Sequence, residues 1–341
     1  MQTHALATPQ TVLITGGAGF IGSHLVRKFL KWGSTVHVLD NLYTGRMDNL
    51  PEHPNLFFHE GSIMDLPTLE RLKAHPFDVI FHLASVVGMR LATKYHDLVY
   101  NTATTGTLNV LNTFRDVPIV LFSSSAVYGM DNTCAVKESA PVAFEQLLQY
   151  DGGKLGYACG KYEMEQIGKR AAQNGRKVLI IRPFNVVGKR QLGTYGMVIP
   201  TFINQALQNK PLTIYDDGFQ VRSFSCIQTF VKCLCKLMEH NEAWTADKNI
   251  VNIGTNNGLS INDLAGIVLQ ETKSHSLVKY HLYEDFFQNH KDVVYRVPDT
   301  AYGEQFYGPV EWPSLRDIVK DILQNFTVEA VKTEARLSAS L

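Results

Sequence analysis

The residues from Val12 to Leu25, VLITGGAGFIGSHL, decide the fold: an apolar run leads into a glycine-rich turn and then into a helical pattern. Gly16, Gly19 and Gly22 stand three residues apart in that turn. Glycines at this spacing allow a tight turn, let the backbone approach a pyrophosphate and bring the following helix against the sheet. The N-terminus of that helix then faces the phosphate charge. The stretch therefore predicts a dinucleotide-binding strand-turn-helix unit.

A second β-branched run, TVHVLD, ends at Asp40, 18 residues after Gly22. An acidic side chain at this point can accept hydrogen bonds from ribose hydroxyls and would repel the 2′-phosphate of NADP. The sequence therefore favours NAD as the cofactor. Arg46 keeps NADP open as an alternative, because an arginine just beyond the acidic residue can accommodate a 2′-phosphate.

Short β-branched runs alternate with helical patterns from Thr11 to about Ile181. This alternation is typical of βαβ units, in which helices cover both faces of a parallel sheet. The expected fold class is α/β, a Rossmann-like doubly wound parallel sheet with a smaller C-terminal α/β substrate-binding lobe. The expected strands of the sheet are TVLIT, TVHVLD, LFFHEG, DVIFHLA, PIVLFSS and KVLIIRP.

After Pro183 the rhythm of strands and helices becomes less regular, which indicates the smaller lobe. In SINDLAGIVLQET, Ser260 and Asp263 have the spacing of a helix cap. We expect an NAD-binding domain at 1–182, with its core from about residue 11, and a mainly substrate-binding lobe at 183–326 that can return segments to the first domain. We expect 327–341 to form a flexible tail.

The composition limits the class of protein. The 341 residues are 45% hydrophobic and 19% charged, an ordinary globular balance. Lys plus Arg and Asp plus Glu number 32 each, so neither nucleic acid nor a membrane is an expected partner. The five cysteines have no paired spacing, so we expect free thiols and no metal site. The start MQTHALATPQ lacks the regions of a secretory signal, so we expect a soluble cytoplasmic protein.

Tyr157 and Lys161 lie four residues apart in GYACGKYEMEQ. On a helix this spacing places both side chains on one face, so the ammonium can lie close to the phenol. A phenol is a poor base at neutral pH because its ordinary pKa is about 10. A neighbouring cation favours the phenolate and lowers that pKa. The pair is therefore a candidate for proton transfer.

Eight motifs follow one another along the chain: TGGAGFIG, DNLYTGR, FHLAS, NTATTGTLNVL, FSSSAVYG, YACGK, RPFNVVG and DDGFQVRSF. Together they resemble the motifs of the extended short-chain dehydrogenase/reductase family, in particular its nucleotide-sugar epimerases and dehydratases. The resemblance covers roughly residues 11–312 and is specific for the family, but it does not identify the substrate.

The resemblance assigns three catalytic residues. Ser124, four residues before the tyrosine of the VYG element, would hydrogen-bond the sugar hydroxyl that is oxidised. Tyr157 would take the proton of that hydroxyl, and Lys161 would hold the cofactor and tune Tyr157. Ser123 would lie nearer the nicotinamide.

The resemblance also implies a set of cofactor contacts. Ser62 stands where the family usually has an aspartate beside the adenine, and Asn101 would brace the central helix near the site. The full implied set is Gly16, Gly19, Phe20, Ile21, Gly22, Asp40, Asn41, Ser62, Ile63, Leu83, Ala84, Ser85, Asn101 and Ser123, together with Tyr157 and Lys161.

For the substrate, the resemblance implies that Asn185 contacts the sugar diphosphate and that Arg222 neutralises it. Ile199 would border the nucleotide base. Asp292 aligns with a carboxylate that binds a nucleotide ribose. A UDP-linked nucleotide sugar is thus the partner that the resemblance implies, and a homodimer built on the helix of Tyr157 is implied as well.

The residues after Ser124 discriminate between reactions in this family. A 4,6-dehydratase carries an acid pair where this chain has Ser125 and Ala126, and a UDP-glucuronate decarboxylase keeps a glutamate at the position of Ala126. An epimerase needs neither acid. The sequence therefore favours 4-epimerisation of a UDP-sugar through a transient 4-keto intermediate.

Three alternatives remain open. A nucleotide-sugar 4,6-dehydratase or a UDP-glucuronate decarboxylase could take its acid from the unusually long segment 143–156, which holds Glu145, Asp151 and Lys154. From another class, the chain could be a non-catalytic NAD-binding regulator on the same fold.

Overall fold

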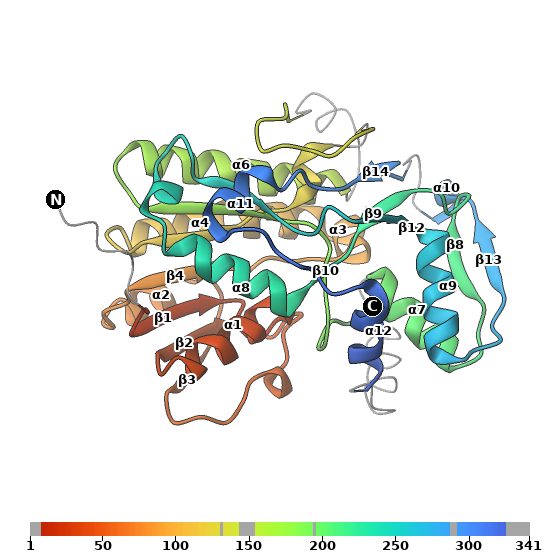
Figure 1. Cartoon of the computed structure of the whole chain (residues 1–341). Helices are drawn as coiled ribbons and strands as arrows, with labels where there is room; N and C mark the ends of the chain where they lie inside the picture. Colours follow the sequence, from red (N-terminus) through yellow and green to blue (C-terminus); the bar gives the residue numbers. More distant parts are fainter. Residues whose placement is uncertain (1–7, 130–131, 143–153, 194–195, 287–291, 325–341) are drawn as a thin grey trace.

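The computed structural model describes residues 8–129, 132–142, 154–193, 196–286 and 292–324. Seven parallel strands form the central sheet in the order β11-β6-β5-β4-β1-β2-β3 (Figure 1). The order reverses between β1 and β4, which confirms the doubly wound, Rossmann-like sheet. The strands are β1 (Thr11–Thr15), β2 (Thr35–Asp40), β3 (Leu56–Glu60), β4 (Val79–His82), β5 (Ile119–Phe122), β6 (Val178–Pro183) and β11 (Ile250–Ile253).

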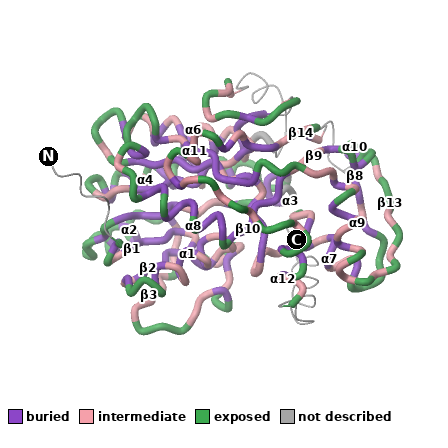
Figure 2. Tube along the Cα trace, viewed as in Figure 1, coloured by how far each residue is buried: buried purple, intermediate pink, exposed green. Residues whose placement is uncertain are grey.

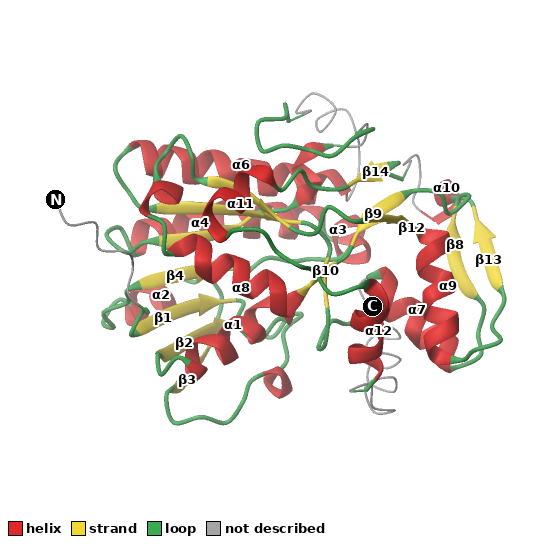
Figure 3. Ribbon diagram, viewed as in Figure 1, coloured by secondary structure: helices red, strands yellow, loops and turns green. Residues whose placement is uncertain are grey.

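Helices cover both faces of the sheet because its strand residues are apolar on both sides (Figure 3). In β1, Val12 and Ile14 pack towards one layer and Leu13 towards the other. The first layer contains α1 (Phe20–Lys31), α8 (Ile227–Met238) and α11 (Ala301–Tyr307). The second contains α2 (Leu66–Leu72), α4 (His96–Thr113) and α6 (Lys154–Gln173).

A second lobe surrounds its own apolar core, built on α7 (Val198–Leu207), α9 (Ile261–Thr272) and α12 (Leu315–Leu323). The expected cap of α9 is present: Ser260 and Asp263 form a capping box. The chain after Pro183 also returns to the first lobe, where α8 covers the sheet and β11 extends it beside β6. Figure 2 shows the two buried regions, one along the sheet and one between these helices.

The remaining elements are short. They are α3 (Met89–Lys94), β7 (Val186–Val187), β8 (Leu212–Tyr215), β9 (Val221–Ser223), β10 (Ser225–Cys226), β12 (Gly258–Ser260), β13 (Val278–His281), α10 (Tyr283–Phe286) and β14 (Tyr295–Arg296). Strand β9 lies between β12 and β14, and β8 pairs with β13.

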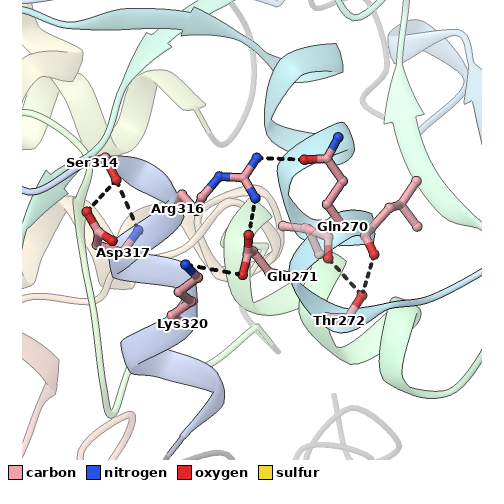
Figure 4. A network of polar contacts seen from close by, with 9 residues as sticks. Gln270, Glu271, Thr272, Ser314, Arg316, Asp317 and Lys320 are labelled. Atoms are coloured by element: carbon pink, nitrogen blue, oxygen red, sulfur yellow. Dashed lines mark hydrogen bonds and ion pairs between the residues drawn. The ribbon is translucent and has the colours of Figure 1, made fainter.

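Polar contacts fasten α12 to α9 within the second lobe (Figure 4). Arg316 forms an ion pair with Glu271 and donates from Nη2 to Oε1 of Gln270 at 2.6 Å. Lys320 lies 3.9 Å from the other Glu271 oxygen. Ser314 caps α12 by accepting from the amide of Asp317. These contacts fix α12, the last described helix, against α9.

Within the described part of the chain, no helix is both long enough and apolar enough to cross a membrane. The residues expected to form a flexible tail, 327–341, lie outside the described part, and so do Glu145, Asp151 and the side chain of Lys154.

Candidate functional site

The carboxyl ends of the central strands open into a cavity of about 1060 Å³ that residues of both lobes line. This is the edge at which open α/β sheets bind ligands, next to the reversal of strand order. All but one of the residues expected at the site line it: Gly16, Gly19, Phe20, Ile21, Gly22, Asp40, Asn41, Ser62, Ile63, Leu83, Ala84, Ser85, Ser123, Ser124, Tyr157, Lys161, Asn185, Ile199, Arg222 and Asp292.

Asn101 is the exception. Asn101 lies on the exposed side of α4 and is not among the residues that line the cavity, although Leu98 and Thr102 of the same helix are. Its expected role, to brace the central helix near the site, stays a prediction.

The glycine turn leaves room that no other residue would leave. Gly16 has a φ of +73°, and a Cβ there would lie 2.7 Å from the amide nitrogen of Ala84. A Cβ on Gly22 would lie 2.3 Å from the carbonyl oxygen of Gly16. Helix α1 begins directly after Gly19, so its free amide groups face the cavity. This cradle fits a pyrophosphate.

Asp40 ends β2 at the edge of this cradle. Its carboxylate accepts from the amides of Ala18 at 3.0 Å and of Leu42 at 2.8 Å, which fix its orientation. Burial raises the pKa of Asp40, and these two hydrogen bonds oppose the rise. Arg46 does not line the cavity; it pairs with Asp48 at 2.9 Å. Among the described residues no cation pairs with the Asp40 carboxylate, which fits NAD better than NADP.

The hydroxyl of Ser85 is a further sign that a ligand belongs here. It is buried and has no hydrogen-bond partner among the described residues, yet Ser85 lines the cavity. A buried hydroxyl without a partner is costly unless a ligand or water satisfies it. Together with the glycine cradle and Asp40, it fits a dinucleotide.

We expect Asp40→Ser to weaken NAD binding about 10-fold to 100-fold, because a charge-assisted hydrogen bond contributes roughly 1.5–3 kcal/mol. NADP binding should weaken less or improve, since the repulsion of the 2′-phosphate is removed. Titration calorimetry with both cofactors measures the ratio of their affinities. Asp116→Ser, which changes an exposed carboxylate outside the cavity, is the matched control. An unchanged NAD/NADP ratio would contradict the role of Asp40.

Ser124, Tyr157 and Lys161 meet deeper in the cavity, at the end of β5. The backbone after β5 enters the 3₁₀ turn Ser125–Tyr128, and the Ser124 hydroxyl caps that turn by accepting from the amide of Ala126 at 3.1 Å. Burial raises the pKa of Tyr157, and a hydrogen bond with Ser124 opposes the rise. Lys161 Nζ lies 5.9 Å from the centre of the Tyr157 ring. A sugar hydroxyl placed here would meet both a hydroxyl and a phenol.

Lys161 is buried, and its ammonium donates to the carbonyl oxygen of Phe122 at 2.7 Å. Burial lowers the pKa of Lys161 to about 7, and the nearby carboxylate of Glu165 limits the drop. The Phe122 carbonyl at the end of β5, just before Ser124, holds the lysine. Its position relative to Tyr157 therefore does not depend on a ligand.

We expect Lys161→Met to be more stable than the wild type at about pH 6, with a difference that shrinks as the pH rises towards about 9. The folded pKa of about 7 lies below the ordinary 10.5, so the unfolded chain binds more protons between these values and wild-type stability rises with pH. Below pH 7 the wild type carries the full cost of a buried charge.

Urea unfolding of the NAD-free protein at several pH values measures this difference. Lys169→Met, on the same helix and partly exposed, is the matched control. A stability difference between Lys161→Met and wild type that stays constant over this range would contradict the buried charge of Lys161.

A buried polar network that the sequence did not reveal supports Ser123. Its hydroxyl donates to Oε1 of Glu165 at 2.5 Å. Arg182 donates from Nε and Nη2 to the two Glu165 oxygens at 2.8 and 2.6 Å, and from Nη1 to the Tyr128 hydroxyl at 2.9 Å. Tyr128 donates in turn to Asn252 at 2.7 Å. The network therefore links α6, β6 and β11 beneath the three successive serines 123–125, the serine run.

The substrate side of the cavity carries paired charges. Arg222 on β9 lies 3.1 Å from Asp292, and both line the cavity. Burial lowers the pKa of Arg222, while Asp292 opposes the shift. Asn185, with a φ of +35°, donates to the carbonyl oxygen of Ser223 at 2.9 Å. The structure thus brings Asn185 and Arg222 to one wall, as expected.

Two arginines that line this cavity were not identified from the sequence. Arg296 on β14 pairs in register with Arg222 and donates to the carbonyl oxygen of Gly129. Burial and Arg222 lower the pKa of Arg296 to about 10. Arg190, with a φ of +70°, donates from Nε to the Ser23 hydroxyl at 2.9 Å. Arginines that line a ligand cavity favour an anionic ligand.

Ser125 and Ala126 also line the cavity, beside Ser124. Among the described residues that line it, the carboxylates are Asp40 and Asp292. Asp40 lies at the glycine cradle and Asp292 pairs with Arg222, so neither stands next to Ala126 as an acid would in an elimination.

The chain is similar to known proteins over most of its length. Residues 12–254 match the model of the NAD dependent epimerase/dehydratase family. A UDP-N-acetyl-alpha-D-glucosaminuronate decarboxylase of Bacillus cytotoxicus is 32% identical over 88% of this chain and 93% of its own. A putative UDP-glucose 4-epimerase of Methanocaldococcus jannaschii is 34% identical over 76% of this chain and 82% of its own.

Among solved structures, UDP-glucose 4-epimerase of Thermotoga maritima with UDP-glucose superposes with a TM-score of 0.80 at 27% identity, covering 92% of this chain and 97% of that one. The glycine cradle, Asp40 and the free Ser85 hydroxyl fit NAD. On these grounds the chain belongs to the NAD-dependent epimerase/dehydratase family, and its cofactor is NAD.

Proposed function

We propose that the protein is a nucleotide-sugar 4-epimerase that acts on a UDP-sugar through a transient 4-keto intermediate. One observation carries the proposal. Ser124 and Tyr157 stand together where a sugar hydroxyl can reach both, and Ala126 leaves their surroundings without a carboxylate among the described residues that line the cavity. The described residues of this site support oxidation and reduction at one carbon, and none of them supplies an acid there for eliminating water.

In this reaction Tyr157, Ser124 and Lys161 would have different roles. Tyr157 would take the proton of the C4 hydroxyl and return it at the end, while Ser124 would orient that hydroxyl. Lys161, held on the Phe122 carbonyl, would favour the phenolate when it is protonated. NAD, when bound, supplies reversible hydride transfer. Return of the hydrogen to the opposite face of C4 requires the 4-keto sugar to turn within the cavity.

The diphosphate would lie at the arginines of the second lobe. Arg222 and Arg296 occupy paired positions on neighbouring strands, and Arg222 is already held by Asp292. Arginine suits this role because its fork of donors matches phosphate oxygens. A diphosphate fixed here would let the sugar rotate without leaving the protein.

A decarboxylase of a UDP-linked uronic acid is the second candidate. The relative from Bacillus cytotoxicus, at 32% identity, is named as a decarboxylase, and Arg296 reaches the Gly129 carbonyl beside the serine run, where it could meet a sugar carboxylate. A 4-keto uronic acid is also a β-keto acid, which loses carbon dioxide with little help from an added acid. A 4,6-dehydratase, by contrast, needs an acid and a base at C5 and C6.

The experiment is to incubate the full chain and NAD with UDP-hexoses, their N-acetyl forms, UDP-glucuronate and dTDP-glucose, and to analyse products by mass and by NMR. An epimer of unchanged mass supports the proposal. Loss of carbon dioxide from the uronate identifies the decarboxylase, and loss of water identifies a dehydratase. NAD binding with no turnover of any sugar would favour a non-catalytic regulator.

A further inference from the structure

Three histidines converge at the edge of the sheet, outside the cavity. His37 lies on β2, His59 on β3, and His75 in the turn that follows α2. One ring nitrogen of each lies within 4.8 Å of those of the other two. We propose that His37, His59 and His75 form a binding site for a divalent transition-metal ion of the zinc type. The site is separate from catalysis and does not rest on the proposed function.

The sheet itself places two of the ligands. Strands β2 and β3 are parallel, with His37 opposite Phe57 and Leu39 opposite His59, so both histidines point to one face. Their rings are stacked with centroids 5.2 Å apart at 6°, and His37 Nδ1 lies 3.0 Å from His59 Nε2. The two nitrogens therefore face one another across the strands.

The third ligand approaches from the connection between α2 and β4. The ring of His75 lies 4.3 Å from that of His37 and 6.1 Å from that of His59, measured between centroids. Its backbone is fixed on both sides, because the His75 amide donates to Leu72 and its carbonyl accepts from Phe77. Three imidazoles on three different elements thus surround one point.

The spacing matches a tetrahedral ion. Zn–N bonds of roughly 2.0–2.1 Å imply ligand nitrogens about 3.3–3.4 Å apart. The pair at 3.0 Å and the outer limit of 4.8 Å lie on either side of that value, so small rotations of the rings would complete the site. Imidazole is a preferred ligand of zinc, copper, nickel and cobalt ions, whereas calcium and magnesium prefer oxygen.

The surroundings leave room for an ion beside the three rings. His37 is buried, and its Nδ1 shares a hydrogen bond with Nε2 of His59, which a bound ion would replace. A cavity of about 250 Å³, lined by His59 and His75, gives room for water as a fourth ligand. Glu60 and Arg71 line the same cavity with opposite charges, and Arg71 donates to Thr68 at 2.8 Å.

An ion here would tie the outer strand of the sheet to its neighbour. Strand β3 is the edge strand, and β2 and β3 lead directly to Asp40 and Ser62 at the cofactor side. The spacing of the three histidines, 22 and 16 residues, has no known motif, and only the folded sheet brings them together. The expectation of no metal site was based on the spacing of the cysteines, so it did not consider these histidines.

The test uses the full untagged chain, stripped of metal with a chelator. Titration with Zn²⁺ is expected to show one ion per chain, and Co²⁺ is expected to give the visible absorption bands of a tetrahedral nitrogen site. His59→Gln and His75→Gln should each weaken Zn²⁺ binding about 100-fold or more, because each removes one of three protein ligands. The melting temperature should rise with Zn²⁺ in the wild type and not in these variants.

His275→Gln, an exposed histidine of the second lobe, and His4→Gln are the controls and should bind as the wild type does. Circular dichroism and NAD affinity show whether each variant is folded. The proposal fails if no ion binds at micromolar concentration, or if His59→Gln and His75→Gln fold and still bind Zn²⁺ as tightly as the wild type. It also fails if His4→Gln alone abolishes binding.

Discussion

Tyr157→Phe is expected to lower kcat about 10²-fold to 10⁴-fold, the usual contribution of a positioned proton-transfer group. The phenylalanine ring keeps the packing of Tyr157 against Val86, Leu91, Ala92 and Val99 and removes only the hydroxyl. KM for the sugar and the affinity for NAD should stay close to those of the wild type, because the pyrophosphate cradle and the arginines are untouched. Turnover is measured on whichever UDP-sugar reacts.

Tyr162→Phe is the matched control, since Tyr162 lies on the same helix and does not line the cavity. It should retain nearly full kcat. If Tyr157→Phe turns over like Tyr162→Phe, then Tyr157 does not transfer the proton, and the catalytic role given to the Tyr157–Lys161 pair is wrong. If both variants lose activity together, the loss reflects the helix and not the phenol.

Much of the site could be predicted because its residues are local in sequence. The glycine cradle, Asp40 and the Tyr157–Lys161 pair each follow from spacing within a single βαβ unit or a single helix. Six of the seven strands of the sheet were predicted for a similar reason, since β-branched runs between helical patterns mark buried parallel strands; β11, which returns from the second half of the chain, was not among them. Asn101 shows the limit of this reasoning: its position in a motif does not place it among the residues that line the cavity.

The rest depends on contacts between distant elements. Glu165, Arg182 and Asn252 come from α6, β6 and β11, and nothing in their spacing indicates that they meet. Arg182 carried one usable signal. It interrupts the apolar run VLIIRP of a buried strand, and a charge in such a place is almost always paired. The sequence therefore indicated that Arg182 has a buried partner, but it did not indicate which residue that partner is.

Glu165→Gln is expected to destabilise the NAD-free protein by about 3–5 kcal/mol, because removing one partner of a buried ion pair leaves the other charge uncompensated. Arg182 and Glu165 are 2% and 0% exposed and joined by two hydrogen bonds, so water cannot replace the lost carboxylate. Urea unfolding gives the change in the free energy of unfolding.

Glu163→Gln, two residues earlier on α6, provides the comparison. Glu163 pairs with Arg170 at 3.6 Å with both side chains partly exposed, and such pairs contribute about 0–1 kcal/mol. If Glu165→Gln costs no more than Glu163→Gln, the buried network is not a stabilising element.

The double variant Glu165→Leu/Arg182→Met separates the loss of the pair from the burial of an unpaired charge. It should recover part of the stability lost in Glu165→Gln, since an apolar pair of similar volume often replaces a buried ion pair without large cost. The network also reaches the catalytic residues, because the Glu165 carboxylate opposes the drop in the pKa of Lys161. Glu165→Gln should therefore lower that pKa further and extend the lower limit of the pH window of the Lys161→Met comparison to lower pH. A window that stays in place would mean that Glu165 supports the fold without tuning the lysine.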